Sequence, residues 1–301
     1  MIPRPSSKVL ARVTLAHVGM MRRTGAGNRR GRMSRQIYPK LIEAEYARSM
    51  VSLLDTTRHL ITPLVRELPS LLESARRERG DMRMDAGEAK RARELIAKAR
   101  AQLEGGLRDD AVEALAAKFA QRTETYQRIQ LGRQVRAVLG ADVMHADTHI
   151  RSIVDHFLNE NVSLIKTVPT RLFDQLQGLT DRAFTSGMTT DTLAREIEDR
   201  FDVGETNARR IARDQIGKLY GQVNASRQKD MGITSFIWRT AGDERVRDEH
   251  EILNGEEFSY DDPPDEGLPG EPIQCRCYAE PVFSSLNDDE ENVGATAGDD
   301  E

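Results

Sequence analysis

The residues best suited to bind a metal or a ligand lie near the C-terminal end of the chain. Cys275 and Cys277, the two cysteines of the chain, are separated by one residue. His250 and Asp243 precede them. Thiolates and imidazole nitrogens are good zinc ligands, and a structural zinc site has four ligands, which leaves Asp243 or water for the fourth position. The residue types therefore allow a structural zinc site at His250, Cys275, Cys277 and Asp243.

A purely structural interpretation of the same residues is also open. Either cysteine could be buried as an inert apolar side chain, while His250 donates a hydrogen bond that fixes the following loop. Asp243 could form an ion pair with Arg245 or Arg247, or could cap a turn. In both cases these side chains would stabilise a small domain through internal contacts and would not bind a ligand.

An enzymatic interpretation has less sequence support. His250 follows Asp248 and Glu249, as in some metal-dependent hydrolases, but there is no H-E-x-x-H motif and no phosphate-binding glycine loop. A cysteine with His250 could form a nucleophile and base, but no glycine-flanked nucleophile turn is present. We therefore expect no catalysis; the alternative is a metal-dependent hydrolase or toxin-like effector domain that uses His250 and Asp243.

A second histidine pair lies upstream of this region. His145 and His149 are four residues apart and could chelate a metal with Asp142 or Asp147. No glutamate stands between the two histidines, and such a pair is more typical of a solvated helix face.

The two ends of the chain carry opposite charges. Residues 1–40 contain ten Lys or Arg and no acidic residue, and residues 284–301 contain seven acidic residues and no basic one. We expect a flexible basic arm and a flexible acidic tail. A basic arm can bind DNA phosphates regardless of base sequence; a solubilising arm without a partner is the alternative. The candidate contacts to double-stranded DNA are Arg22, Arg23, Arg29, Arg30 and Arg32.

The composition excludes several classes of protein. Charged residues make up 31% and hydrophobic residues 38% of the chain, a balance that suits long helices with solvated faces. No segment approaches the roughly 18 to 20 apolar residues that a membrane span needs. Arg12 interrupts the semi-apolar segment 9–21, so no secretory signal is expected. With two cysteines that are separated by one residue, the chain cannot form a disulfide framework. The lack of such a framework fits synthesis in the cytoplasm.

Most of the chain is expected to be helical. Apolar residues recur at steps of three and four over residues 37–78, which predicts a long helix that is kinked or broken near Pro63 and Pro69. Further helices are predicted at residues 88–103, 109–139, 148–165, 169–185, 189–200 and 205–231.

The pattern changes at Gly232. Residues 233–240 alternate apolar and polar side chains and predict a strand with Trp238 in the core. A short helix at 245–253, a loop at 261–272 and strands at 257–260 and 277–283 are predicted to follow. The fold class is mainly α, with long helices followed by a small α+β C-terminal module. The predicted domains are a basic arm (1–36), a helical region (37–204), the C-terminal module (205–283) and an acidic tail (284–301).

The C-terminal module resembles the Mu F-like minor head proteins of bacteriophages. The shared pattern is W-x-T-x-x-D-x-R-V-R-x-x-H-x-x-L-x-G-x-x-F, then a loop rich in proline and glycine, then C-x-C. The preceding helix is also similar, with Arg213, Asp214 and Gln215 where the family usually has Arg-Thr-Glu. The resemblance covers about residues 205–283. The signature residues in this chain are Trp238, Thr240, Asp243, Arg245, Arg247, His250, Gly255, Phe258, Cys275 and Cys277.

This resemblance implies a structural role in a virus particle. A family member would be a minor protein of the phage head that is made in the host cytoplasm. It would be associated with the portal vertex and act in head morphogenesis and in genome packaging or DNA ejection. The implied partners are the portal protein and the major capsid protein. The long helices before the signature could supply an apolar stripe that binds a partner.

Overall fold

The computed structural model describes residues 35–80, 87–139, 148–186 and 188–283. Nearly all of the predicted basic arm, with the five candidate DNA-binding arginines, lies outside these residues, as does the acidic tail. His145, Asp142 and Asp147 of the second histidine pair also lie outside them. The expectations for these segments stay predictions.

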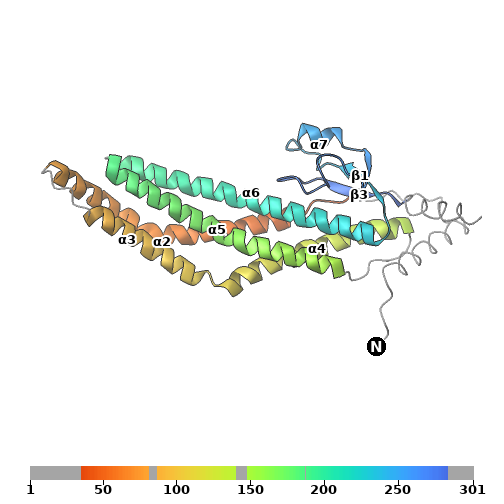
Figure 1. Ribbon diagram of the computed structural model, residues 1–301, viewed down its shortest axis with the longest axis horizontal. Helices are drawn as coiled ribbons and strands as arrows, with labels where there is room; N and C mark the ends of the chain where they lie inside the picture. The colour runs from red at the N-terminus through yellow and green to blue at the C-terminus, as the bar shows by residue number, and fades with distance from the viewer. Residues whose placement is uncertain (1–34, 81–86, 140–147, 187, 284–301) are drawn as a thin grey trace, which may run out of the picture. The chain divides into compact units, whose positions relative to one another are not determined.

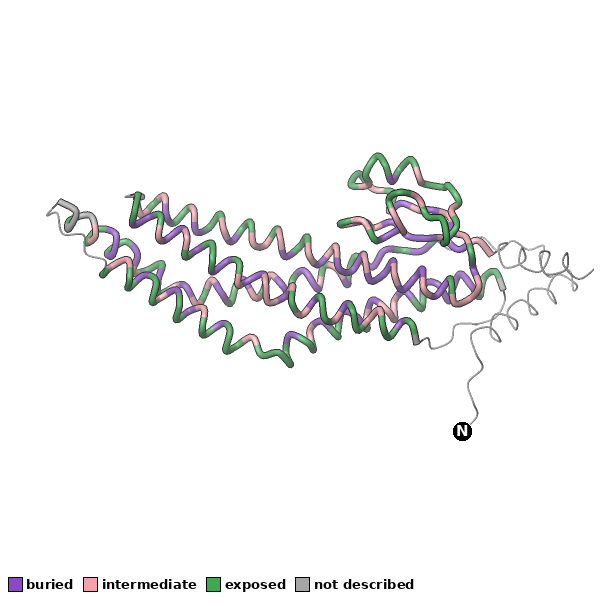
Figure 2. The backbone as a smooth tube through the Cα atoms, viewed as in Figure 1, coloured by how far each residue is buried: buried purple, intermediate pink, exposed green. Residues whose placement is uncertain are grey.

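Long α-helices make up most of the described chain, as predicted (Figure 1). Figure 2 shows buried and exposed positions alternating along each of these helices, which is typical of amphipathic helices. No described helix is long and apolar enough to cross a membrane. The long helices are α2 (Lys40–Gly80), α3 (Gly87–Gly106), α4 (Asp109–Leu139), α5 (Thr148–Ser186) and α6 (Thr190–Asp230).

Three predicted helix breaks are wrong. Helix α2 continues through Pro63 and Pro69, so it is not broken there, and the alternative of a kink stays a prediction. Helix α5 continues through Pro169. Helix α6 likewise passes through the predicted gap at 201–204. A proline removes one backbone hydrogen bond, and packing of the flanking apolar residues can offset that loss. Leu64 and Leu68 beside the exposed prolines of α2 are buried, which is consistent with this compensation.

Contacts divide the described chain into two compact units. The first unit contains residues 35–40, 120–139, 148–157 and 214–283, and the second contains 41–80, 87–119, 158–186 and 188–213. Helices α4, α5 and α6 contribute to both units. The division within α6 falls after Arg213, whereas the predicted domain boundary at 204–205 lies further upstream in the same helix.

The second unit is a helical bundle with an aromatic contact in its core. Tyr46 of α2 and Phe119 of α4 are fully buried, and their ring centroids are 4.7 Å apart. The Tyr46 hydroxyl donates a 2.6 Å hydrogen bond to Asn161 of α5. Since a buried hydroxyl without a partner is costly, this bond allows tyrosine to occupy the core.

The first unit contains the only sheet of the described residues. Strand β1 (Ser235–Arg239) lies between β2 (Glu257–Ser259) and β3 (Tyr278–Pro281), and both pairings are antiparallel. The short helix α7 (Asp248–Ile252) connects β1 to β2. The three strands and α7 lie within the predicted segments, so the mainly α fold with a small α+β C-terminal module is confirmed (Figure 1).

Buried amide side chains hold the sheet against α6 in this unit. Asn224 accepts hydrogen bonds from Gln36 and from Gln127 of α4, at 3.1 and 2.9 Å. Asn224 and Gln228 both donate to the carbonyl oxygen of Ala279 in β3, at 2.8 and 2.9 Å. These bonds fix the position of β3 and of Cys277, the residue before it.

Candidate functional site

The structure brings three of the four predicted metal ligands together. Cys275 Sγ and Cys277 Sγ lie 3.6 and 3.5 Å from Nδ1 of His250. The three ligand atoms all lie within 4.8 Å of one another. All three side chains are at least 95% buried. Within the described residues, this is the group of His, Cys, Asp or Glu side chains whose geometry suits a metal ion.

The position of His250 depends on helix α7. This helix has only five residues, and so short a helix has little stability of its own. The indole ring of Trp238, the residue of β1 with the largest buried side chain, packs edge-on against the imidazole at a centroid distance of 5.3 Å. Trp238 is thus in the core, as predicted, and its ring helps to orient His250.

The two cysteines lie on a loop that is pressed against helix α6. A methyl group on Gly217 would lie 2.6 Å from the carbonyl oxygen of Cys275, and one on Gly221 would lie 2.5 Å from that of Pro269. Only glycine permits such close backbone contact. The Gln274 amide also donates a 2.8 Å hydrogen bond to Asp214 of α6. Helix α6 therefore forms the base on which the C-x-C segment is positioned.

Asp243 does not join the group of three. Its two carboxylate oxygens each accept a 2.5 Å hydrogen bond from the guanidinium of Arg276, the residue between the two cysteines. These bonds lower the pKa of Asp243. Asp243 also accepts a 3.3 Å bond from the backbone N–H of Arg245, which fits the turn-capping alternative. Its ion-pair partners are Arg276 and Lys40 instead of the expected Arg245 or Arg247.

The thiol groups of the pair strongly affect each other's ionisation. Hydrogen bonding from the Cys277 thiol lowers the pKa of Cys275 to about 6, and the same contact raises the pKa of Cys277. The backbone N–H of Cys277 also points to Cys275 Sγ at 3.4 Å. One sulfur of the pair is thus favoured as a thiolate, which is the form of cysteine that binds metals.

A carboxylate faces the other nitrogen of the His250 ring. Glu266 Oε2 lies 3.5 Å from His250 Nε2, within ion-pair distance, but the two atoms do not form a hydrogen bond. Sequence reasoning missed Glu266 because it is one of five acidic residues in the loop at 261–272. The missed residues Gly217 and Gly221 did carry a signal, since two glycines four residues apart weaken a helix unless another segment packs on them.

The remaining signature residues mainly support the module. Thr240 is fully buried and its backbone N–H donates to Asn254 at 3.2 Å. Arg247 donates to the carbonyl oxygen of Ile273 at 2.7 Å. Gly255 has a positive φ of 99°, and Phe258 of β2 packs on the core of the module. Arg245 is exposed.

His149, of the second predicted histidine pair, is exposed on α5. Its Nδ1 lies 3.4 Å from Asp230. Its predicted partners fall outside the described residues, so the chelating role of this pair stays a prediction.

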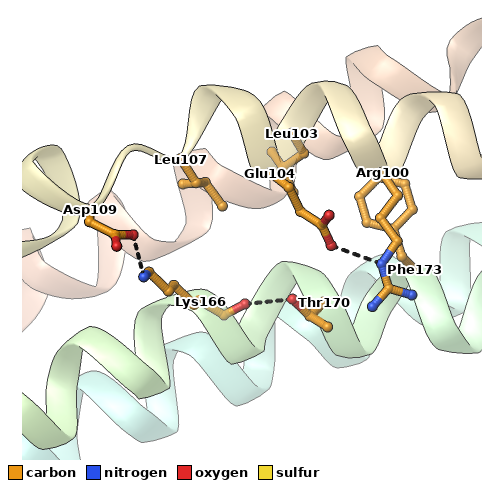
Figure 3. A pocket seen from close by; sticks show the side chains of 8 residues that line it. All are labelled: Arg100, Leu103, Glu104, Leu107, Asp109, Lys166, Thr170 and Phe173. Atoms are coloured by element: carbon orange, nitrogen blue, oxygen red, sulfur yellow. Dashed lines mark hydrogen bonds and ion pairs between the residues drawn. The ribbon is translucent and has the colours of Figure 1, made fainter.

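A separate pocket of about 280 Å³ lies in the second unit between the α3–α4 connection and α5 (Figure 3). Its charged side chains pair with one another or with near neighbours. Lys166 contacts Asp109 at 2.5 Å, and Arg100 contacts Glu104 at 3.0 Å and Asp174 at 2.7 Å. The charged side chains that could bind a ligand already have partners within the protein, so the pocket gives no indication of a ligand.

Comparisons with known proteins agree with the signature in the C-terminal module. Residues 174–280 match the family model described as Phage Mu protein F like protein. A Haemophilus influenzae protein, described as an uncharacterized protein, is 29% identical over 182 residues. That match spans 59% of this chain and 41% of the relative, so the chain covers less than half of the relative's length. No solved structure matches the chain. Over residues 174–280, the chain is similar to the Phage Mu protein F like family, in agreement with the resemblance that the signature residues indicate.

Proposed function

We propose that this protein is a minor structural component of the phage head that acts at the portal vertex. The family match over residues 174–280 is the observation that carries the proposal. The proposed partners are the portal protein and the major capsid protein, and the proposed location is the virion. The role would consist of contact with other head proteins during assembly, with genome packaging or DNA ejection as the steps it supports.

The geometry of the signature favours contact over catalysis. The two oxygens of Asp243 are held by Arg276, and His250 is buried among side chains of its own module. A substrate would have to displace these internal contacts before it could reach either residue. A module that is fixed by internal contacts and attached to long helices suits a protein that makes stable contacts with other proteins in an assembly.

Co-expression with the portal protein of the same phage tests the portal contact. The full chain and the portal are expected to elute together in size-exclusion chromatography and to form cross-links from the chain to the portal. Separate elution, with no cross-link between the two proteins, would contradict a direct portal contact. The same experiment with the major capsid protein tests the second partner.

DNA binding by the basic arm is the second part of the proposal. Ten basic residues without an acidic one in residues 1–40 favour binding to the DNA backbone. If Arg22, Arg23, Arg29, Arg30 and Arg32 each contact a phosphate, the logarithm of the binding constant should fall with the logarithm of salt with a slope of about −4 to −5. Removing residues 1–36 should abolish this binding, and removing the tail at 284–301 should not weaken it. Binding that is independent of salt would refute the role.

The hydrolase or effector alternative requires His250 and Asp243 to act together. Nuclease and peptidase assays on the wild type and on His250→Ala separate the two functions. The structural proposal expects no turnover by either protein. Turnover by the wild type alone, with equal head assembly by both proteins, would establish the enzymatic alternative.

A further inference from the structure

We propose that His250 Nδ1, Cys275 Sγ and Cys277 Sγ bind one zinc ion, and that Glu266 orients His250 from outside the coordination sphere. This inference is independent of the role in the phage head. It differs from the expectation based on the sequence, because Asp243 is not one of the ligands.

The distances between the three ligand atoms fit a tetrahedral zinc site. Zinc lies about 2.3 Å from a thiolate sulfur and about 2.0–2.1 Å from an imidazole nitrogen. With tetrahedral angles, these bond lengths separate the nitrogen from each sulfur by about 3.6 Å. The two nitrogen–sulfur distances in the structure are 3.6 and 3.5 Å. Both nitrogen–sulfur distances therefore already match those of a bound ion, and the two sulfur atoms lie within 4.8 Å of each other.

Hydrogen bonding alone explains this arrangement less well. The Nδ1 atom of a neutral imidazole either carries one hydrogen or offers one lone pair, so it forms one good hydrogen bond. Here it faces two sulfur atoms at nearly the same distance. A cation between the three atoms would interact with all of them at once, and Cys and His are the ligands that zinc prefers.

Buried polar atoms around the group also fit a bound ion. Nε2 of His250 is buried and has no hydrogen-bond partner among the described residues. Zinc-bound histidines commonly donate this second N–H to a carboxylate, which fixes the ring and strengthens the ligand. Glu266 Oε2 lies 3.5 Å from Nε2, and its side chain is partly exposed. A small shift of that side chain would complete the hydrogen bond.

The fourth ligand is assigned to a water molecule. Asp243 is engaged by Arg276, and Glu266 faces the nitrogen that does not bind the metal. The zinc ion would connect α7 to the segment before β3, two parts of the module that are 25 residues apart in sequence. Three protein ligands and one water are the usual ligand set of a catalytic zinc. The burial of all three protein ligands is the reason to assign this site a structural role instead.

Metal analysis of the full chain, purified under reducing conditions without chelator, tests the proposal. One zinc ion per chain is expected, and cobalt that replaces it should give a thiolate-to-metal charge-transfer band. Cys275→Ser, Cys277→Ser and His250→Ala should each lose the ion. Asp243→Asn and His149→Ala should each retain one ion. Glu266→Gln should bind zinc about 10–100-fold more weakly.

A second measurement on the wild type covers the case in which the ligand variants fail to fold. Thiol labelling should be slower with zinc present than after a strong chelator removes it. Re-addition of zinc should restore protection. Absence of zinc in the purified chain, no uptake of added zinc or cobalt, and labelling rates unaffected by chelator would overturn the proposal. Loss of the ion in a folded Asp243→Asn variant would overturn the ligand set.

Discussion

Replacing Gly217 by alanine should destabilise the C-terminal module, although the same change usually stabilises a helix. The added methyl group would lie 2.6 Å from the carbonyl oxygen of Cys275. That oxygen belongs to the backbone of a loop which is also held by a hydrogen bond from Gln274 to Asp214. The loop must therefore move away from α6, since no flexible side chain can yield in its place.

The size of the effect follows from two opposing contributions. Alanine in a helix interior gains about 0.8–1 kcal/mol over glycine. Forcing an extra carbon into a packed contact costs about 1–3 kcal/mol, or more when backbone must shift. Because the contact is with backbone, the upper end of this cost applies, and the expected net loss for Gly217→Ala is about 2 kcal/mol. Gly178→Ala is the matched control, because a methyl group there would lie 3.5 Å from the flexible end of Arg182, and we expect a gain of about 1 kcal/mol.

Fluorescence of Trp238 measures this effect directly. It is the only tryptophan of the chain and is fully buried in the module, so its signal reports the unfolding of that unit. In urea titrations, Gly217→Ala should lower the midpoint of the Trp238 transition. Because Gly178 lies in the second unit, the gain expected for Gly178→Ala is measured by circular dichroism of the helices. A Gly217→Ala protein as stable as the wild type would refute the close contact between α6 and the C-x-C loop.

Three further predictions concern the stability of the fold. Arg276 lowers the pKa of Asp243 in the folded state, so the stabilising charge of Asp243 is fully present above about pH 4 and is lost as the pH falls towards that lower pKa. Asp243→Asn should therefore cost about 1–2 kcal/mol at neutral pH and should make the Trp238 urea midpoint decline less steeply in acid. If the variant and the wild type show the same decline in acid, the pairing with Arg276 is contradicted. Phe236→Ala, at a fully buried position of β1, should cost about 3–5 kcal/mol in the same titration, whereas a loss below about 1 kcal/mol would show that the core is elsewhere. Pro63→Ala, at an exposed interior position of α2, should raise the melting temperature measured by circular dichroism, with a gain of up to about 3 kcal/mol; a lower melting temperature would mean that the helix requires the proline.

The helical character of the chain could be predicted because it depends on local periodicity. Apolar residues at steps of three and four identify the helices, and the alternation around Trp238 identifies β1. The predicted breaks in α2 and α5 failed because the cost of Pro63 or Pro169 is local, whereas the compensating packing comes from distant segments. Sequence periodicity contains no information about those contacts.

The candidate site was predictable in its residue types but not in all of its partners. His250, Cys275 and Cys277 are recognisable because Cys and His are the side chains that zinc prefers. The pairing of Asp243 with Arg276 was not predicted, because the two residues are 33 positions apart and exposed arginines closer in sequence offered simpler partners. Strand β3 directly follows the C-x-C segment. Its antiparallel pairing with β1 contributes to the short distance between Asp243 and Arg276.

Quantitative mass spectrometry of purified heads most directly tests the proposal that the protein is a structural part of the phage head. The protein should be present in heads assembled by the phage that encodes it, at a low and constant ratio to the portal protein. It should be lost from heads that are assembled without the portal. Heads that lack the protein while the infected cell contains it in quantity would contradict the claim.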